Sequence, residues 1–161
     1  MQHVLDLGLP AIADDDPWAS VRADLAEEYA ASHAFPWVVG FSGGKDSTVV
    51  VHLVFELLLS LPRSERRRRI HIVANDTLVE SPLVISHIAG VQAELRRAVR
   101  ALNLPMEVVT TRPSPDATFW VNLVGRGYPS PNRTFRWCTD RMKIQPTSRY
   151  IREQIDNAGQ V

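Results

Sequence analysis

The chain has 161 residues, of which 45% are hydrophobic and 22% are charged, and its formal net charge is zero. This length supports one domain with a proper core, and the composition is that of a soluble globular protein. The sequence has no apolar run of membrane-spanning length and no basic stretch followed by an apolar one near Met1, and its single cysteine excludes an internal disulfide framework. We therefore expect a cytoplasmic protein that has no membrane partner.

The charges are unevenly spread along the chain. Residues 1–34 carry seven acidic side chains against Arg22 alone, whereas residues 125–152 carry seven basic side chains against Asp140 alone. A basic end suggests an anionic partner, which would be nucleotide, nucleic acid or both. The alternative, which charge alone does not separate from the first, is a solvated surface whose charges pair with the acidic end.

The first predicted element is a helix over residues 14–32. Asp16 is a good N-cap, and Pro17 suits the first helical position. We expect residues 1–35 to form an N-terminal helical segment and residues 36–161 to form the main domain.

A short apolar strand, residues 36–40, then runs into Ser42-Gly43-Gly44-Lys45-Asp46-Ser47 and a helix that extends to Leu61. Two adjacent glycines let a ligand approach the backbone closely, and N–H groups at a helix start form an anion site. Lys45 adds a positive charge, and Asp46 can hold a divalent cation. The alternative is an ordinary strand-to-helix turn, which rarely combines these residue types.

Further along the chain, strands are expected over residues 70–74 and 106–111, with a helix over residues 83–102 between them. Ser81 and Pro82 are start signals for that helix. Strands that alternate with helices predict a parallel α/β sheet with right-handed crossovers. Ligands of such sheets bind at the carboxyl ends of the strands, and Asn75, Asp76 and Thr77 follow the second strand there.

Residues 112–132 interrupt this alternation and are predicted to be a lid or substrate insertion. Aromatic residues interleaved with arginine and glycine suit base stacking and phosphate contact, whereas the alternative is a small satellite core. We expect elements of both, with Phe119, Trp120 and Leu123 buried and Arg126 and Tyr128 presented. A last helix is expected over residues 147–157.

The string from Ser42 to Ser47 resembles the pyrophosphate loop of the ATP pyrophosphatases, also called adenine nucleotide α-hydrolases. The resemblance narrows with Asn75-Asp76-Thr77, with the Phe-Trp-Val-Asn-Leu and Gly-Arg-Gly-Tyr-Pro strings of the insertion, and with Arg136-Trp137-Cys138-Thr139-Asp140-Arg141 followed by Lys143. Together these look like the DndC-type sulfurtransferases of bacterial DNA phosphorothioation, a branch of the phosphoadenosine-phosphosulfate-reductase-like proteins. The similarity runs from about Trp37 to Arg152.

The resemblance implies a Rossmann-like parallel sheet with helices on both faces and an ATP- and Mg²⁺-dependent reaction. A DNA phosphate would be adenylated with release of pyrophosphate, and sulfur from a cysteine desulfurase would displace AMP. Other DNA phosphorothioation proteins are further expected partners. Four groups of residues would carry this chemistry: Lys45, Asp46, Arg136 and Cys138 for catalysis; Ser42, Gly43, Gly44, Ser47, Asn75, Asp76 and Thr77, with Lys45 and Asp46, for ATP; Arg126, Tyr128, Arg141 and Lys143 for the substrate; and Asp46 for Mg²⁺.

Two departures from the family pattern leave alternatives open. Family members are expected to hold a [4Fe–4S] cluster, but one thiolate cannot anchor such a cluster, so Cys138 is a ligand whose partners are missing, a persulfide carrier or a packed thiol. The sheet is also expected to be cut short after the third strand. The first strand would then keep an open edge that the N-terminal segment, a partner or a second copy covers.

Two other functions therefore stay open besides the sulfurtransferase. One is a non-catalytic module that binds nucleotide or DNA and assembles with phosphorothioation proteins. The other is a sulfate-nucleotide reductase or a tRNA-thiolation enzyme. The intact Lys45-Asp46 pair favours ATP use over sulfate reduction.

Overall fold

The computed structural model describes residues 16–32 and 35–157. The chain divides into two compact units, Met1–Ser32 and His33–Val161. The described part of the first unit contains one helix, α1 (Ala19–Ala30). The strands described in the structure all lie in the second unit, which therefore holds the predicted site.

Helix α1 begins later than the sequence pattern predicts. Its N-cap is Trp18 rather than Asp16. The Asp16 carboxylate instead accepts a hydrogen bond from the Trp18 N–H at 2.9 Å and pairs with Arg22. The hydrogen bond from Trp18, ahead of the charge of Arg22, lowers the pKa of Asp16. The predicted first residues of the helix, Asp14 and Asp15, lie outside the described residues.

Three parallel strands form one sheet in the order β1-β2-β3. Their bounds are β1 (Trp37–Gly40), β2 (Ile70–Asn75) and β3 (Met106–Thr111). The register places Trp37 beside Ile70 and Ile70 beside Met106, so the carboxyl ends of the strands meet at one edge. Among the described residues β1 pairs with β2 alone, which leaves its other edge unpaired, as the sequence led us to expect.

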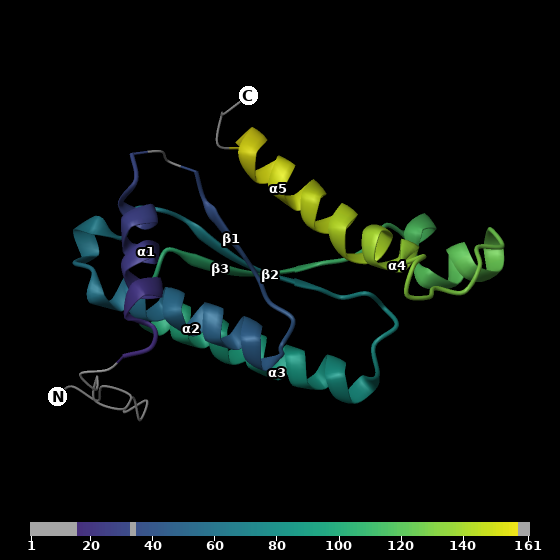
Figure 1. Ribbon diagram of the computed structural model, residues 1–161, viewed down its shortest axis with the longest axis horizontal. Helices are drawn as coiled ribbons and strands as arrows, with labels where there is room; N and C mark the ends of the chain where they lie inside the picture. Colours follow the sequence, from purple (N-terminus) through teal and green to yellow (C-terminus); the bar gives the residue numbers. More distant parts are fainter. Residues whose placement is uncertain (1–15, 33–34, 158–161) are drawn as a thin grey trace. The chain divides into compact units, whose positions relative to one another are not determined.

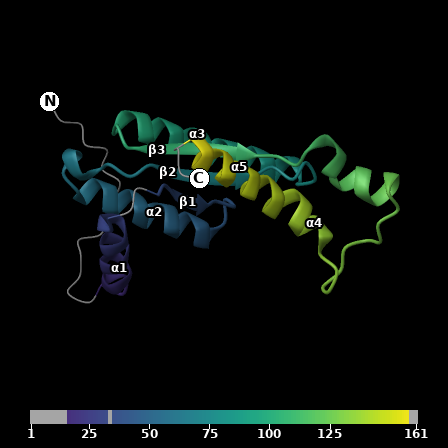
Figure 2. The same ribbon diagram turned by 90° about the horizontal axis from the view of Figure 1, so that it is seen from above.

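Helices cover both faces of this sheet (Figures 1 and 2). On one face lie α2 (Lys45–Ser60) and α3 (Pro82–Ala101), the helices of the two strand-to-strand crossovers. On the other face α5 (Gln145–Asn157) packs against β2 and β3. Crossovers of the same handedness put successive helices on one side of a sheet whose strand order is sequential, as α2 and α3 lie here (Figure 1). The predicted Rossmann-like α/β fold is thus confirmed.

The core lies around β2, whose residues from Ile70 to Ala74 are all buried. A strand that is covered on both faces reads as a continuous apolar run rather than an alternating one. Helix α2 contributes Val54 and Leu58 from one face, but Val49 and Val50 are exposed. The sequence of α2 is apolar nearly all round, which predicts a helix buried on all sides. This prediction is wrong for the first turns of α2.

A buried polar contact joins α5 to the sheet. The Tyr150 hydroxyl and His71 Nδ1 share a hydrogen bond of 2.7 Å, and the His71 side chain is almost fully buried. Burial, supported by the charge of Arg69 and opposed by Glu107, lowers the pKa of His71 below its usual 6.5. Burial also raises the pKa of Tyr150 to about 12, and Glu107 and Glu153 add to this effect. Both groups are therefore neutral in the folded protein at pH 7.

None of the helices within residues 16–32 and 35–157 is both long enough and apolar enough to cross a bilayer.

The buried His71 predicts a pH dependence of stability. The unfolded chain takes up a proton near pH 6.5, whereas folded His71 resists protonation, so acidification favours unfolding. The stabilisation that neutral His71 gives to the folded state is complete above pH 6.5. Below that pH the free energy of unfolding falls by at most about 1.4 kcal/mol per pH unit because of His71. Urea unfolding between pH 7.5 and 5.5 should show a shallower pH slope for His71→Gln than for the wild type.

Equal slopes for His71→Gln and the wild type would contradict the assignment of His71 as the buried neutral group.

Candidate functional site

The predicted phosphate loop connects β1 to α2 at the carboxyl edge of the sheet. Gly43 has φ +77°, a conformation that L residues rarely adopt. A Cβ atom on Gly43 would also lie 2.9 Å from Ile88 Cγ1 of α3. His87 Nε2 lies 3.4 Å from the Gly43 carbonyl oxygen on the same side. Gly43 is therefore required both for the turn and for its close packing against α3.

The start of α2 is open. Its N-cap is Gly44, and no side chain of the described residues caps the helix. The first N–H groups of an α-helix have no partner within the helix, and together with the helix dipole they attract an anion. The loop is not filled by packed side chains, because Ser42, Gly44, Lys45 and Asp46 are exposed. The backbone here can therefore receive phosphate oxygens.

Hydroxyl groups fix the shape of this loop. The Ser47 and Thr48 hydroxyls each donate to the Gly44 carbonyl oxygen at 2.9 Å. The Ser42 and Ser47 hydroxyls lie 3.2 Å apart, and the Ser42 N–H donates to Ser47 Oγ at 3.3 Å. The two serines that the resemblance assigns to ATP thus form hydrogen bonds within the loop. A bound phosphate would have to replace some of these hydrogen bonds.

Lys45 and Asp46 extend into solvent at the head of α2. Their side chains are 90% and 87% exposed, and Lys45 Nζ lies 2.5 Å from Asp46 Oδ1. Exposed ion pairs contribute little to stability, so the pair has no evident structural role. Among the described residues no group of three histidine, cysteine or acidic side chains could hold a metal ion. Asp46 can therefore hold Mg²⁺ only if phosphate oxygens and water complete the coordination.

Asn75, at the end of β2, ties three segments together. Its side-chain N–H groups donate to Thr111 Oγ1 at 2.7 Å, to Thr147 Oγ1 at 2.7 Å and to the Lys143 carbonyl oxygen at 3.4 Å. These contacts hold the segment that follows Cys138 at the carboxyl edge, the same edge that carries the phosphate loop. The amide of Asn75 is engaged in holding the edge together.

Asp76 and Thr77 are also engaged within the protein. Asp76 Oδ2 accepts a hydrogen bond from Arg112 Nε at 2.9 Å, and its Oδ1 accepts one from the Leu78 N–H at 3.1 Å. Leu78 has φ +63°, which is uncommon for a bulky residue. Thr77 is buried and donates to Glu80 Oε1 at 3.2 Å. The Arg112–Asp76 pair was not predicted, although an arginine directly after a strand was a visible signal.

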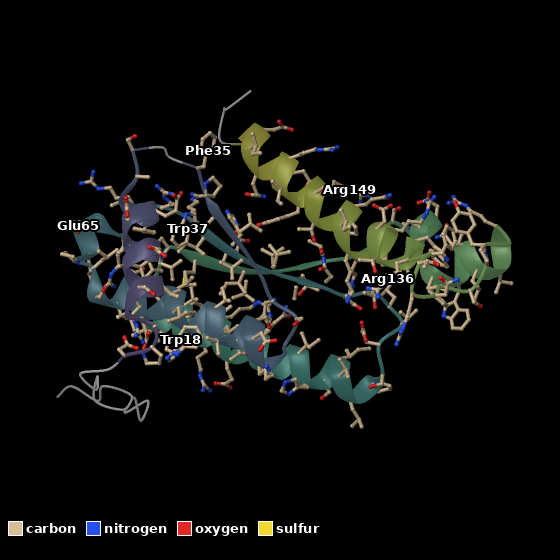
Figure 3. The ribbon with its side chains drawn as sticks, in the orientation of Figure 1. Trp18, Phe35, Trp37, Glu65, Arg136 and Arg149 are labelled. Carbon is tan, nitrogen blue, oxygen red and sulfur yellow. The ribbon has the colours of Figure 1, made fainter. Side chains whose placement is uncertain are left out.

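The Cys138 segment begins with the short helix α4 (Trp137–Thr139), continues through a π-helical turn (Asp140–Ile144) and joins α5. Figure 3 shows Arg136 just before α4 and Arg149 on α5. Arg136 and Lys143 are exposed, and Cys138 is a half-buried free thiol. A [4Fe–4S] cluster does not fit this segment, because the chain contains a single cysteine.

Aromatic side chains join the predicted insertion to the Cys138 segment in what we call the aromatic row. Phe119 stacks on Trp137 with ring centres 5.4 Å apart and touches Trp120 edge to face at 5.2 Å. Tyr128 meets Trp137 edge on at 5.4 Å. Arg141 completes the row, with its guanidinium 5.2 Å from the centre of the Tyr128 ring and its Nη2 donating to the Tyr128 hydroxyl at 2.7 Å.

The row overturns part of the sequence-based expectation for the insertion. Trp120 is 62% exposed, not buried, because Phe119 and Trp137 already fill the space between the two segments. Tyr128 is half-buried within the row rather than presented. Arg126 is exposed, as the sequence predicts, and donates to Asn122 Oδ1 at 3.3 Å and to Asp116 Oδ2 at 3.5 Å. The hydroxyl of Ser114, ahead of the charge of Arg126, lowers the pKa of Asp116.

Two hollows lie at the opposite edge of the sheet. A cavity of about 340 Å³ at the amino ends of β2 and β3 is lined by Arg69, His71 and Glu107, among others. A neighbouring cavity of about 240 Å³ is lined by Arg63 and Arg66. Arg66 is held by the carbonyl oxygens of Leu59 and Leu61. Because helix N-termini and strand carboxyl ends meet at the other edge, these hollows do not form part of the candidate site.

A distant relative of the chain is an archaeal protein. No protein-family model matches the chain. The chain is 27% identical over 122 residues to an uncharacterized protein of Methanocaldococcus jannaschii, MJ0066. The match covers 76% of this chain but only 21% of the relative, so the chain spans about a fifth of the relative's length.

Gly43 gives the sharpest structural prediction for the loop. We expect Gly43→Ala to lower the free energy of unfolding by about 1–2 kcal/mol, because the left-handed backbone is strained for alanine, and also to weaken nucleotide binding. Urea unfolding and calorimetric titration with ATP would measure the two effects.

Gly90 provides the control, since it lies in α3 and a Cβ there would meet nothing within 4 Å. Gly90→Ala should be neutral or stabilising by up to about 1 kcal/mol, because alanine favours helix over glycine. If Gly43→Ala behaved like Gly90→Ala in both assays, the proposed loop geometry would be wrong.

Proposed function

We propose that this chain uses ATP to adenylate an oxygen of a DNA backbone phosphate and supports the replacement of that oxygen by sulfur, as a DndC-type sulfurtransferase. The observation that carries the proposal is the open start of α2, where no side chain caps the helix, Gly43 packs closely against α3, and Ser42, Gly44 and Lys45 are exposed. This combination favours a polyphosphate over other anions, because several donors and a cation converge on it.

Each residue of the loop would have a separate task. The amides at Gly44 and in the first turn of α2 would hold the leaving diphosphate, and Lys45 would neutralise part of its charge. Asp46 would share a Mg²⁺ ion with the phosphate oxygens. The DNA oxygen would attack the α-phosphorus, and the bond to the β-phosphate oxygen would break with release of pyrophosphate. A sulfur nucleophile from a cysteine desulfurase would then displace AMP.

The basic residues of the C-terminal segment divide into two groups. Arg136 and Lys143 are exposed and are the candidates for contact with the DNA phosphate. Arg141 contacts Tyr128, which suits a role in positioning the aromatic row, and Arg126 is paired with Asp116 within the protein. The observed contacts therefore favour Arg136 and Lys143 over Arg126 and Tyr128 as substrate ligands.

The proposal gives Cys138 a role that needs no iron–sulfur cluster. A half-buried free thiol on a short helix can accept sulfur as a persulfide, provided that it ionises when sulfur is delivered. A cysteine ligand that lacks its partners and a packed thiol are the alternatives. No step of the proposed ATP cleavage passes through Cys138.

A second candidate is a module that binds nucleotide or DNA and assembles with other phosphorothioation proteins or with a second copy. The unpaired edge of β1 favours it, because an exposed edge is a template for pairing with another chain. A sulfate-nucleotide reductase or a tRNA-thiolation enzyme would share the fold, but neither is favoured by a specific contact among the described residues.

Pyrophosphate release from ATP with Mg²⁺ and DNA separates these functions. We expect Lys45→Ala and Asp46→Ala each to reduce the rate by about 10²- to 10³-fold, because each removes a preorganised charge from the leaving group. The rate is measured by coupled detection of pyrophosphate, with AMP and adenylated DNA followed by chromatography.

The exposed Glu94–Arg97 pair of α3 is the matched control, since Arg97→Ala and Glu94→Ala remove the same kinds of charge away from the loop. Both variants should keep the wild-type rate. Tight ATP binding without pyrophosphate release would favour the assembly module. Release of orthophosphate in place of pyrophosphate would contradict the proposed reaction.

A further inference from the structure

Trp120 is a large aromatic side chain without a partner that would bury it. It stands at the end of the aromatic row, where Phe119 touches it edge to face, and its side chain is 62% exposed. The inner members of the row are better covered, and Trp137 is buried. An exposed indole that is supported from behind by a packed ring is a ready-made stacking surface.

The backbone that carries Trp120 is firmly anchored. Asn122, two residues further on, is completely buried, and its side-chain N–H donates to the Thr118 carbonyl oxygen at 2.8 Å. The Asn122 carbonyl oxygen accepts the Tyr128 N–H at 3.0 Å, which closes the insertion on itself. Val121 and Val124 are exposed on the same helical turn as Trp120. The insertion therefore holds Trp120 and its apolar neighbours outward on a fixed support.

The charge of the neighbouring segment indicates which ligand suits Trp120. The segment from Gly125 to Arg152 carries seven basic residues against one acidic residue, and Arg133 and Arg136 within it are exposed. The aromatic row joins this segment to Trp120 through Trp137, which directly follows Arg136, and Phe119. An exposed aromatic ring combined with cations on an adjoining segment is an arrangement by which proteins hold the bases and phosphates of an unpaired strand. An apolar protein partner would leave these arginines with nothing to neutralise them, so the charge favours a nucleic acid.

We propose that Trp120 stacks on an unpaired nucleobase, so that the chain takes its DNA with at least one base out of the duplex. This inference rests on the proposed function and adds the form of the substrate. A base within a duplex has both faces covered by its neighbours, so stacking on Trp120 requires a single strand or an opened duplex. The exposed arginines then hold the adjacent phosphates.

The test uses the full chain and a fluorescein-labelled 12-nucleotide single-stranded DNA, with the same sequence as a duplex for comparison. Affinity is measured by fluorescence anisotropy at low salt. We expect Trp120→Ala to weaken single-strand binding about tenfold and duplex binding much less. Trp120→Phe should restore most of the affinity. Trp18→Ala, which removes another exposed tryptophan from the first unit, should have no effect.

Four outcomes would overturn the inference. Single-strand binding could be equal for Trp120→Ala and the wild type, or single-strand and duplex binding could fall equally. A third outcome is that Trp120→Ala leaves DNA binding intact and changes the oligomeric mass in light scattering, which would make the surface a protein contact. A fourth is that Trp120→Ala leaves DNA binding intact and weakens ATP binding, which would assign the ring to the nucleotide. Pyrophosphate release that depends on Lys45 and Asp46 would keep the proposed function intact in each case.

Discussion

The left-handed backbone of Gly43 is the constraint on which the arrangement of the candidate site depends. It turns the chain from β1 into α2 within a few residues and leaves the first amides of α2 open. The turn is held from outside as well, because Ile88 and His87 of α3 lie directly against it. A side chain at this position would both strain the backbone and push α3 away. The conformation of the loop therefore depends on packing against α3 as well as on the residues of the loop itself.

Asn75 has a comparable effect on the other side of the site. One amide group contacts β3, the end of the π-helical turn and the start of α5, so the Cys138 segment is fixed to the same edge as the phosphate loop. The aromatic row then joins that segment to the insertion. The proposed reaction would bring nucleotide, sulfur and DNA together, and the carboxyl edge of a parallel sheet is where ligands of such folds bind.

Local patterns predicted much of the fold. The start signals Ser81 and Pro82 are confirmed for α3, where Ser81 Oγ accepts the Val84 N–H at 3.4 Å, and the alternation of strands and helices is confirmed as a parallel sheet. The glycine pair correctly indicated a turn with an open helix start. These features depend on neighbours within a few residues, which is why the sequence reveals them.

The remaining features depend on contacts between distant residues. Asn75 meets partners 36, 68 and 72 residues away, so its role as a tie could not be read from the local sequence. Trp120 was expected to be buried because it lies in an apolar string, but Phe119 and Trp137 occupy the available space. Val49 and Val50 were expected to be buried for the same reason. Apolar character alone does not say which of several large side chains is covered.

The central claim is that the open start of α2, and not the arginine-lined hollows at the amino edge, receives a polyphosphate. Titration of the ¹⁵N-labelled chain with Mg²⁺ and α,β-methylene ATP, followed by amide chemical shifts, tests it directly. The account predicts large shifts at Gly43, Gly44 and Lys45 and none at Arg63 and Arg66. Shifts confined to Arg63, Arg66 and their neighbours would contradict it.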